Sequence, residues 1–127
     1  MIRCACLLET KGEALMLVRV RDNDLWYLPG GTIEIGETDE EALVREIDEE
    51  LGVVIDCETL KFDLRIVGPA LGRQGDVELN CYKARWNGNV TPRAEISEVA
   101  FIGYEQTEIM APAIKILVDE LQKGHHS

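Results

Sequence analysis

The chain has 127 residues and a formal net charge of −11. Its hydrophobic content of 46% and charged content of 29% are typical of one folded globular domain and exclude an intrinsically disordered chain. So acidic a composition lacks the basic face that a nucleic-acid backbone requires, and we therefore expect no nucleic-acid partner. A divalent cation can still join an acidic protein to the phosphates of a small ligand.

The composition also limits where the protein works and what its cysteines do. No uncharged run approaches the roughly 18 residues that a membrane span requires, and Glu9 interrupts the N-terminal apolar stretch too early for a signal peptide. We therefore expect a cytoplasmic protein with no membrane partner. The cysteines show no C-x-x-C spacing, which disfavours a zinc site and predicts buried thiols in strands: Cys4, Cys6, Cys57 and Cys81.

The first third of the chain predicts a pair of strands, then a loop and a helix. Strands are expected at residues 2–8 and 14–20, and the proline and glycines of residues 26–36 predict a loop. Thr38 and Glu41 have the spacing of a capping box, and Gly52 supplies a C-terminal stop. These signals bracket one helix of three to four turns.

The rest of the chain predicts three strands and a closing helix. Strands are expected at residues 53–67, 77–86 and 99–104, and Pro112 stands at a plausible helix start, followed by apolar residues with helical spacing. Nothing indicates a second domain. We therefore expect a single domain over residues 1–123 and a frayed tail over residues 124–127.

The helix that begins after Thr38 is unusually acidic. Eight of the fourteen residues from 37 to 50 are acidic, and Arg45 is the only base. At 100° per residue, Glu46, Glu49 and Glu50 share one arc beside the apolar stripe of the helix. A solvated acidic face would place its charges opposite the core and alternate them with lysines. The crowding instead indicates hard oxygen ligands for Mg²⁺ or Mn²⁺, which also accept phosphate oxygens.

Residues 31–53 resemble the signature of the Nudix (MutT-like) hydrolases. That pattern is G, five residues, E, seven residues, R-E, an aliphatic residue, any residue, E-E, any residue, G and an aliphatic residue. The resemblance, which extends more loosely to nearly the whole chain, implies an α/β fold: an α/β/α sandwich whose mixed β-sheet is flanked by helices and carries the motif as a loop-helix-loop. Every fixed position of the pattern is met, by Gly31, Glu37, Arg45, Glu46, Ile47, Glu49, Glu50, Gly52 and Val53.

The resemblance also implies a function. It implies a divalent-metal-dependent pyrophosphohydrolase that uses Mg²⁺ or Mn²⁺ to cleave a phosphoanhydride bond of a nucleoside diphosphate linked to another moiety. The substrate, a small nucleotide, is either a nucleoside triphosphate or of the ADP-ribose or nucleotide-sugar type. Met110 stands near the position where hydrolases of oxidised guanine nucleotides often carry an asparagine, which disfavours that substrate. Pro69 fits a proline common in ADP-ribose hydrolases, but a Gly68-Pro69 turn explains it equally well.

Two further points follow from the same resemblance. The alternative function is a non-catalytic, nucleotide-binding regulatory module of the same fold. Such modules tend to lose motif carboxylates, whereas this chain retains them. Many small relatives form homodimers, so a homodimer is an expected assembly, although the sequence marks no interface.

The motif assigns roles to individual residues by position. Glu46 and Glu50 resemble direct metal ligands, and Glu49 resembles a further ligand or the group that activates water. The carbonyl of Gly30 often completes the metal shell in such proteins. Arg45 and Glu37 resemble an ion pair that orients the carboxylates. The implied catalytic set is therefore Glu37, Arg45, Glu46 and Glu49.

Weaker candidates lie outside the motif. Family members often use one more glutamate before the last strand, and both Glu95 and Glu98 qualify, with Glu98 preferred as the metal ligand. Arg19 and Arg21 are candidates for binding substrate phosphates, and Trp26 for stacking on the base. The competing interpretations are a charged strand edge for the glutamates, a solvated surface for the arginines and packing of the loop for the tryptophan.

Overall fold

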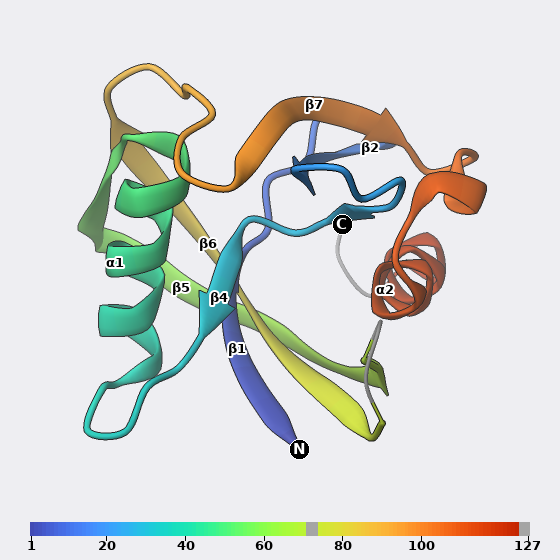
Figure 1. Cartoon of the computed structure of the whole chain (residues 1–127), viewed down its shortest axis with the longest axis horizontal. Helices are drawn as coiled ribbons and strands as arrows, with labels where there is room; N and C mark the ends of the chain where they lie inside the picture. Colours follow the sequence, from blue (N-terminus) through green and yellow to red (C-terminus); the bar gives the residue numbers. More distant parts are fainter. Residues whose placement is uncertain (71–73, 125–127) are drawn as a thin grey trace.

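The computed structural model describes residues 1–70 and 74–124 (Figure 1). Residues 125–127 of the predicted tail therefore lie outside the described residues. The elements, in chain order, are β1 (Ile2–Leu7), β2 (Ala14–Val20), β3 (Trp26–Tyr27), β4 (Gly30–Thr32), α1 (Asp39–Leu51), β5 (Val54–Pro69), β6 (Asp76–Asn87), β7 (Ile96–Gly103), a short 3₁₀ helix (Thr107–Ile109) and α2 (Pro112–Gln122).

The strands form two sheets. The larger sheet has the order β4-β1-β6-β5 and is mixed, because β1 runs parallel to β6 while the pairs β1–β4 and β5–β6 are antiparallel. The smaller sheet has the order β3-β2-β7 and is antiparallel throughout. The parallel pairing joins strands that are far apart in sequence, so the N-terminal strand lies in the middle of the larger sheet.

The two helices lie on opposite sides of the sheets (Figure 1). Side chains alternate along β1, so Ala5 and Leu7 pack in the core beneath α1, whereas Cys6 packs in the core that includes α2. The predicted α/β/α sandwich with a mixed sheet is thereby confirmed. In the described part of the chain, no helix is long and apolar enough to cross a membrane.

Two predictions from the sequence were wrong in detail. Residues 26–36 are not a continuous loop, because β3 pairs with β2 and β4 pairs with β1. Both strands are very short, and β4 pairs with a distant segment, so the local proline and glycine content does not reveal them. The cysteines were expected to be buried, which holds for Cys6 and Cys81; Cys4 is half-buried, and Cys57 is exposed where the pairing of β5 with β6 shifts register.

Helix α1 begins and ends where its capping signals predict. The Thr38 hydroxyl accepts a hydrogen bond from the Glu41 N–H, and the Glu41 carboxylate accepts one from the Thr38 N–H. Gly52 ends the helix in the left-handed conformation, with φ of 68°. The first turn is also tied to the larger sheet, because the Tyr82 hydroxyl donates to the Asp39 carboxylate over 3.2 Å. The helix is therefore fixed in both position and length.

Removing the cap oxygen tests how much this start contributes. We expect Thr38→Ala to lower the free energy of unfolding by about 1 kcal/mol, because an N–H of the first turn loses its acceptor. Thr38→Ser keeps the oxygen and is expected to match the wild type. Urea denaturation of the three proteins measures the difference. Equal stability of the alanine and serine variants would contradict the assignment.

Candidate active site

The acidic arc of α1 lies at the edge of the core. Leu43, Ile47 and Leu51 are fully buried, as the helical pattern predicts. The Glu46 side chain is 18% exposed, and Glu50 is also only partly exposed. The Glu49 side chain is 56% exposed, so it extends further into solvent than the Glu46 side chain. The helix therefore presents two half-buried carboxylates and an exposed third.

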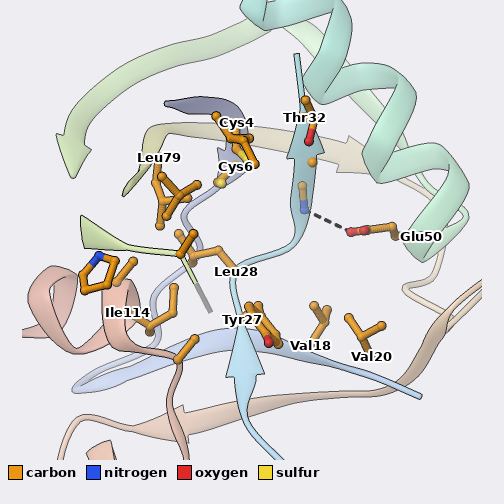
Figure 2. A pocket seen from close by; sticks show the side chains of 18 residues that line it. Cys4, Cys6, Val18, Val20, Tyr27, Leu28, Thr32, Glu50, Leu79 and Ile114 are labelled. Atoms are coloured by element: carbon orange, nitrogen blue, oxygen red, sulfur yellow. Dashed lines mark hydrogen bonds between the residues drawn. The ribbon is translucent and has the colours of Figure 1, made fainter. Parts of the chain in front are cut away.

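These carboxylates lie against the backbone of β4. The Gly30 N–H donates a hydrogen bond of 3.0 Å to the Glu50 carboxylate (Figure 2). A Cβ on Gly31 would lie 2.3 Å from the carboxylate carbon of Glu46, and a Cβ on Gly30 would lie 2.2 Å from the Ala5 carbonyl oxygen. Gly30 also has φ of 140°, which side chains rarely allow. The two glycines therefore let helix and strand approach closely.

Arg45 organises the acidic groups around it. Its Nε and Nη2 atoms donate to the two Glu37 oxygens over 2.7 and 2.9 Å, and its Nη1 atom donates to Glu46 over 2.8 Å. Nη2 also donates to the Thr32 carbonyl over 3.2 Å. This bidentate pair lowers the pKa of Glu37 to about 2. The structure thus brings Glu37, Arg45 and Glu46 together.

Burial disfavours the ionised form of the Glu46 and Glu50 carboxylates when no cation is present. Burial raises the pKa of Glu50 to about 8, against the hydrogen bond from Gly30, and the negative charges of Glu46, Glu49 and Glu95 raise it further. Burial likewise raises the pKa of Glu46, against the effect of Arg45. A divalent cation would offset both penalties, and carboxylate and carbonyl oxygens are its usual ligands. The donor set therefore fits Mg²⁺ or Mn²⁺.

The carboxylates are not gathered into a finished coordination shell. Among residues 1–70 and 74–124, no group of three or more histidine, cysteine, aspartate or glutamate side chains is arranged to hold a metal ion. Glu46 is turned toward Arg45, and Glu50 is turned toward the N–H of Gly30. An ion shared by these two carboxylates would require their side chains to rotate.

The two glutamates before the last strand occupy different places. Glu98 on β7 lies opposite Arg19 on β2 and forms an ion pair with it. Glu95 lies 4.0 Å from Arg21, and its charge contributes to the raised pKa of Glu50. Of the two, Glu95 is therefore the glutamate whose electrostatic contact with the carboxylates of α1 is evident, although the sequence had favoured Glu98.

A cavity of about 290 Å³ lies between the two sheets and opens beside Glu50 (Figure 2). Its walls are mostly apolar. Trp26 packs in the core and does not line this cavity, whereas its neighbour Tyr27 does. The sequence did not predict that most of the apolar lining residues share a cavity, because strand alternation marks a side chain as inward-facing without showing whether a cavity lies there. They include Cys4, Cys6, Val18, Val20, Leu79 and Ile114.

Comparison with known proteins identifies the family. Residues 2–121 match the NUDIX domain. The chain belongs to the Nudix hydrolase family. It is 33% identical over 116 residues to the nucleoside triphosphatase NudI of Salmonella paratyphi B, which covers 80% of this chain and 81% of that protein. It is 45% identical over 47 residues to the ADP-ribose pyrophosphatase of Methanocaldococcus jannaschii, but this match spans only 35% of this chain and 28% of that relative.

Solved structures show the same fold. The MutT Nudix hydrolase from Burkholderia pseudomallei superposes with a TM-score of 0.75 at 18% sequence identity, covering 93% of this chain and 95% of that one. At this identity the likeness concerns the fold alone. The Nudix fold thus accounts for the loop-helix-loop in which α1 lies against β4.

The two glycines of β4 predict opposite outcomes when alanine replaces them. In Gly31→Ala the new methyl group meets the movable Glu46 carboxylate, so we expect stability within about 1 kcal/mol of the wild type. Mn²⁺ affinity should fall about tenfold, because the carboxylate is displaced. Gly30→Ala places its methyl group on rigid backbone and should cost about 3 kcal/mol of folding stability.

Thermal denaturation and Mn²⁺ titration of both variants separate these effects. Unchanged Mn²⁺ affinity in a folded Gly31→Ala protein would show that the position of Glu46 beside β4 does not matter for the ion.

Proposed function

We propose that this protein is a divalent-metal-dependent pyrophosphohydrolase, acting in the cytoplasm on a nucleoside diphosphate linked to another moiety. The observation that carries the proposal is the pair of half-buried carboxylates, Glu46 and Glu50, held against the glycine backbone of β4. Such a site is unfavourable for two anions alone and favourable once Mg²⁺ or Mn²⁺ joins them. The ion in turn suits a substrate that carries phosphates.

Each residue of the site would have a different role in hydrolysis. Glu46, Glu50 and the Gly30 carbonyl would hold the ion, which when bound neutralises charge on the bridging phosphates. Glu49 is exposed enough to accept a proton from an attacking water, either directly or as a further ligand. Arg45 keeps Glu46 oriented through the pair with Glu37. We assign the additional carboxylate to Glu95, because its charge acts on Glu50 and the backbone of Arg93, two residues before it, is hydrogen-bonded to α1.

The cavity between the sheets is the place for the nucleoside. It adjoins Glu50, so a base and sugar bound there would direct the phosphates toward the carboxylates of α1. The relative matched over most of its length is named as a nucleoside triphosphatase, which favours a nucleoside triphosphate. The shorter match to an ADP-ribose pyrophosphatase is the reason to test substrates of the ADP-ribose type as well. Arg19, Arg21 and Trp26 stay predictions as substrate contacts; the first two are paired with acidic residues, and the third is buried.

The competing function is nucleotide sensing without hydrolysis. That function does not require a carboxylate able to accept a proton, yet this chain keeps Glu49 beside the two inner glutamates. It also does not require the Arg45 network that holds Glu46 in place. These features favour the enzyme.

A panel of nucleotides tests the proposed activity. Nucleoside triphosphates, ADP-ribose, nucleotide sugars and dinucleoside polyphosphates are each incubated with Mg²⁺ or Mn²⁺, and with EDTA as control. A phosphatase added in parallel reveals monoester products. We expect metal-dependent cleavage of one group, with nucleoside triphosphates cleaved best. Binding of nucleotides without cleavage of any would favour the sensing module.

A single substitution tests the metal site itself. We expect Glu50→Gln to lower turnover about 100-fold in a folded protein, because a half-buried ligand loses its charge. Asp48→Asn is the matched control, since it removes one charge from an exposed position of the same helix and should keep wild-type turnover. Steady-state rates at saturating Mg²⁺ measure the turnover of both variants against the wild type. Full activity of Glu50→Gln would remove Glu50 from the site.

A further inference from the structure

The loop between β6 and β7 caps the end of the metal-binding helix. The last four carbonyl groups of a helix lack partners within it. Here the Thr91 N–H donates to the Leu51 carbonyl over 2.9 Å, and the Arg93 N–H donates to the Glu50 carbonyl over 2.8 Å. Figure 1 shows this loop beside the C-terminal end of α1. The backbone of one proposed metal ligand is thus bonded directly to the loop.

The side chain of Arg93 adds a second attachment at the same place. A Cβ on Gly52 would lie 2.6 Å from Nε and 2.7 Å from Cζ of Arg93, so the guanidinium occupies the space that a side chain at position 52 would need. The last turn of α1, residues 48–51, contains three acidic residues and no base. Arg93 therefore brings a positive charge to the negative end of the helix dipole, where the helix itself supplies none.

The turn that follows Arg93 sets the position of Glu95. The Ile96 N–H donates to the Arg93 carbonyl over 2.9 Å, which closes the turn, and Ala94 within it has φ of 54°. The Arg21 N–H donates to the Glu95 carbonyl over 2.9 Å, which ties the turn to the end of β2. Ala94 is held in a conformation that non-glycine residues rarely adopt, and such strain persists only where the surroundings enforce it.

We propose that Arg93 is a positioning residue that, by packing on Gly52, fixes the turn 93–96 and thereby holds Glu95 at the C-terminal end of α1, where Glu50 lies. The inference rests on the proposed function in one respect, namely that Glu95 supplies a carboxylate to the metal site. If Arg93 acted through its charge alone, its removal would change the metal affinity in the opposite direction. Removing a nearby cation would then strengthen the attraction of the site for a metal ion, whereas losing the position of Glu95 weakens it.

A double-mutant cycle tests this inference. Mn²⁺ affinity, kcat/KM and thermal stability are measured for the wild type, Arg93→Ala, Glu95→Gln and the double variant, at a temperature well below every melting point. We expect Arg93→Ala to weaken Mn²⁺ binding and to lower kcat/KM, each about tenfold. In the Glu95→Gln background the same change should have no further effect, because the group through which Arg93 acts is already gone.

Two single variants serve as controls. Arg93→Lys keeps the charge but lacks the flat guanidinium, so it should lose nearly as much as alanine. Arg85→Ala removes an exposed arginine from β6, outside the turn 93–96, and should behave as the wild type. Additive losses in the cycle, or tighter Mn²⁺ binding by Arg93→Ala, would overturn the proposal. So would a loss of stability with unchanged Mn²⁺ affinity.

The Mn²⁺ measurement separates this inference from the enzymatic proposal. A wild-type protein that binds Mn²⁺ but cleaves no nucleotide would contradict the proposed hydrolysis, while the Mn²⁺ cycle would still decide the role of Arg93. Cleavage by the wild type with an additive cycle would contradict the role of Arg93 alone. A wild-type protein that binds no Mn²⁺ would overturn both.

Discussion

The close contact between the acidic side of α1 and the glycine backbone of β4 is the constraint on which the rest of this structure depends. It places Glu46 and Glu50 where water is partly excluded, which is costly for two neighbouring anions. The helix cannot stabilise that arrangement by itself, because its own charges repel one another. Other parts of the molecule must therefore hold it, and they do so at both ends and along the buried side.

Each attachment uses a different kind of interaction. At the start, the capping box at Thr38 satisfies backbone donors, and Asp39 bonds to the sheet through Tyr82. At the end, the loop between β6 and β7 satisfies carbonyl groups. Between them, Arg45 meets the carboxylates with a planar group that offers several donors in fixed directions, which a lysine ammonium cannot reproduce. The acidic helix is thus ordered by groups outside its acidic arc.

The sequence predicted the parts of this design that are encoded locally. The limits of α1 and its buried stripe followed from capping residues and helical spacing, and the motif named the inner carboxylates. The strands β3 and β4 were missed, because they are only two and three residues long and β4 pairs with the distant strand β1. The sequence offered both Glu95 and Glu98 and preferred Glu98. Strand alternation brings Glu98 to Arg19, whereas a turn anchored on α1 places Glu95.

The same anchoring explains how a repulsive site coexists with a stable fold. Leu43, Ile47 and Leu51 are completely buried, and each such side chain contributes about 2 kcal/mol, against a few tenths of a kcal/mol for each repulsive pair on the helix. Packing of the apolar stripe therefore dominates, and the helix survives with its carboxylates crowded and poorly solvated. A bound cation would relieve the remaining penalty, so binding and folding favour the same position of α1. The acidic arc is consequently carried by a helix whose apolar stripe is firmly packed in the core.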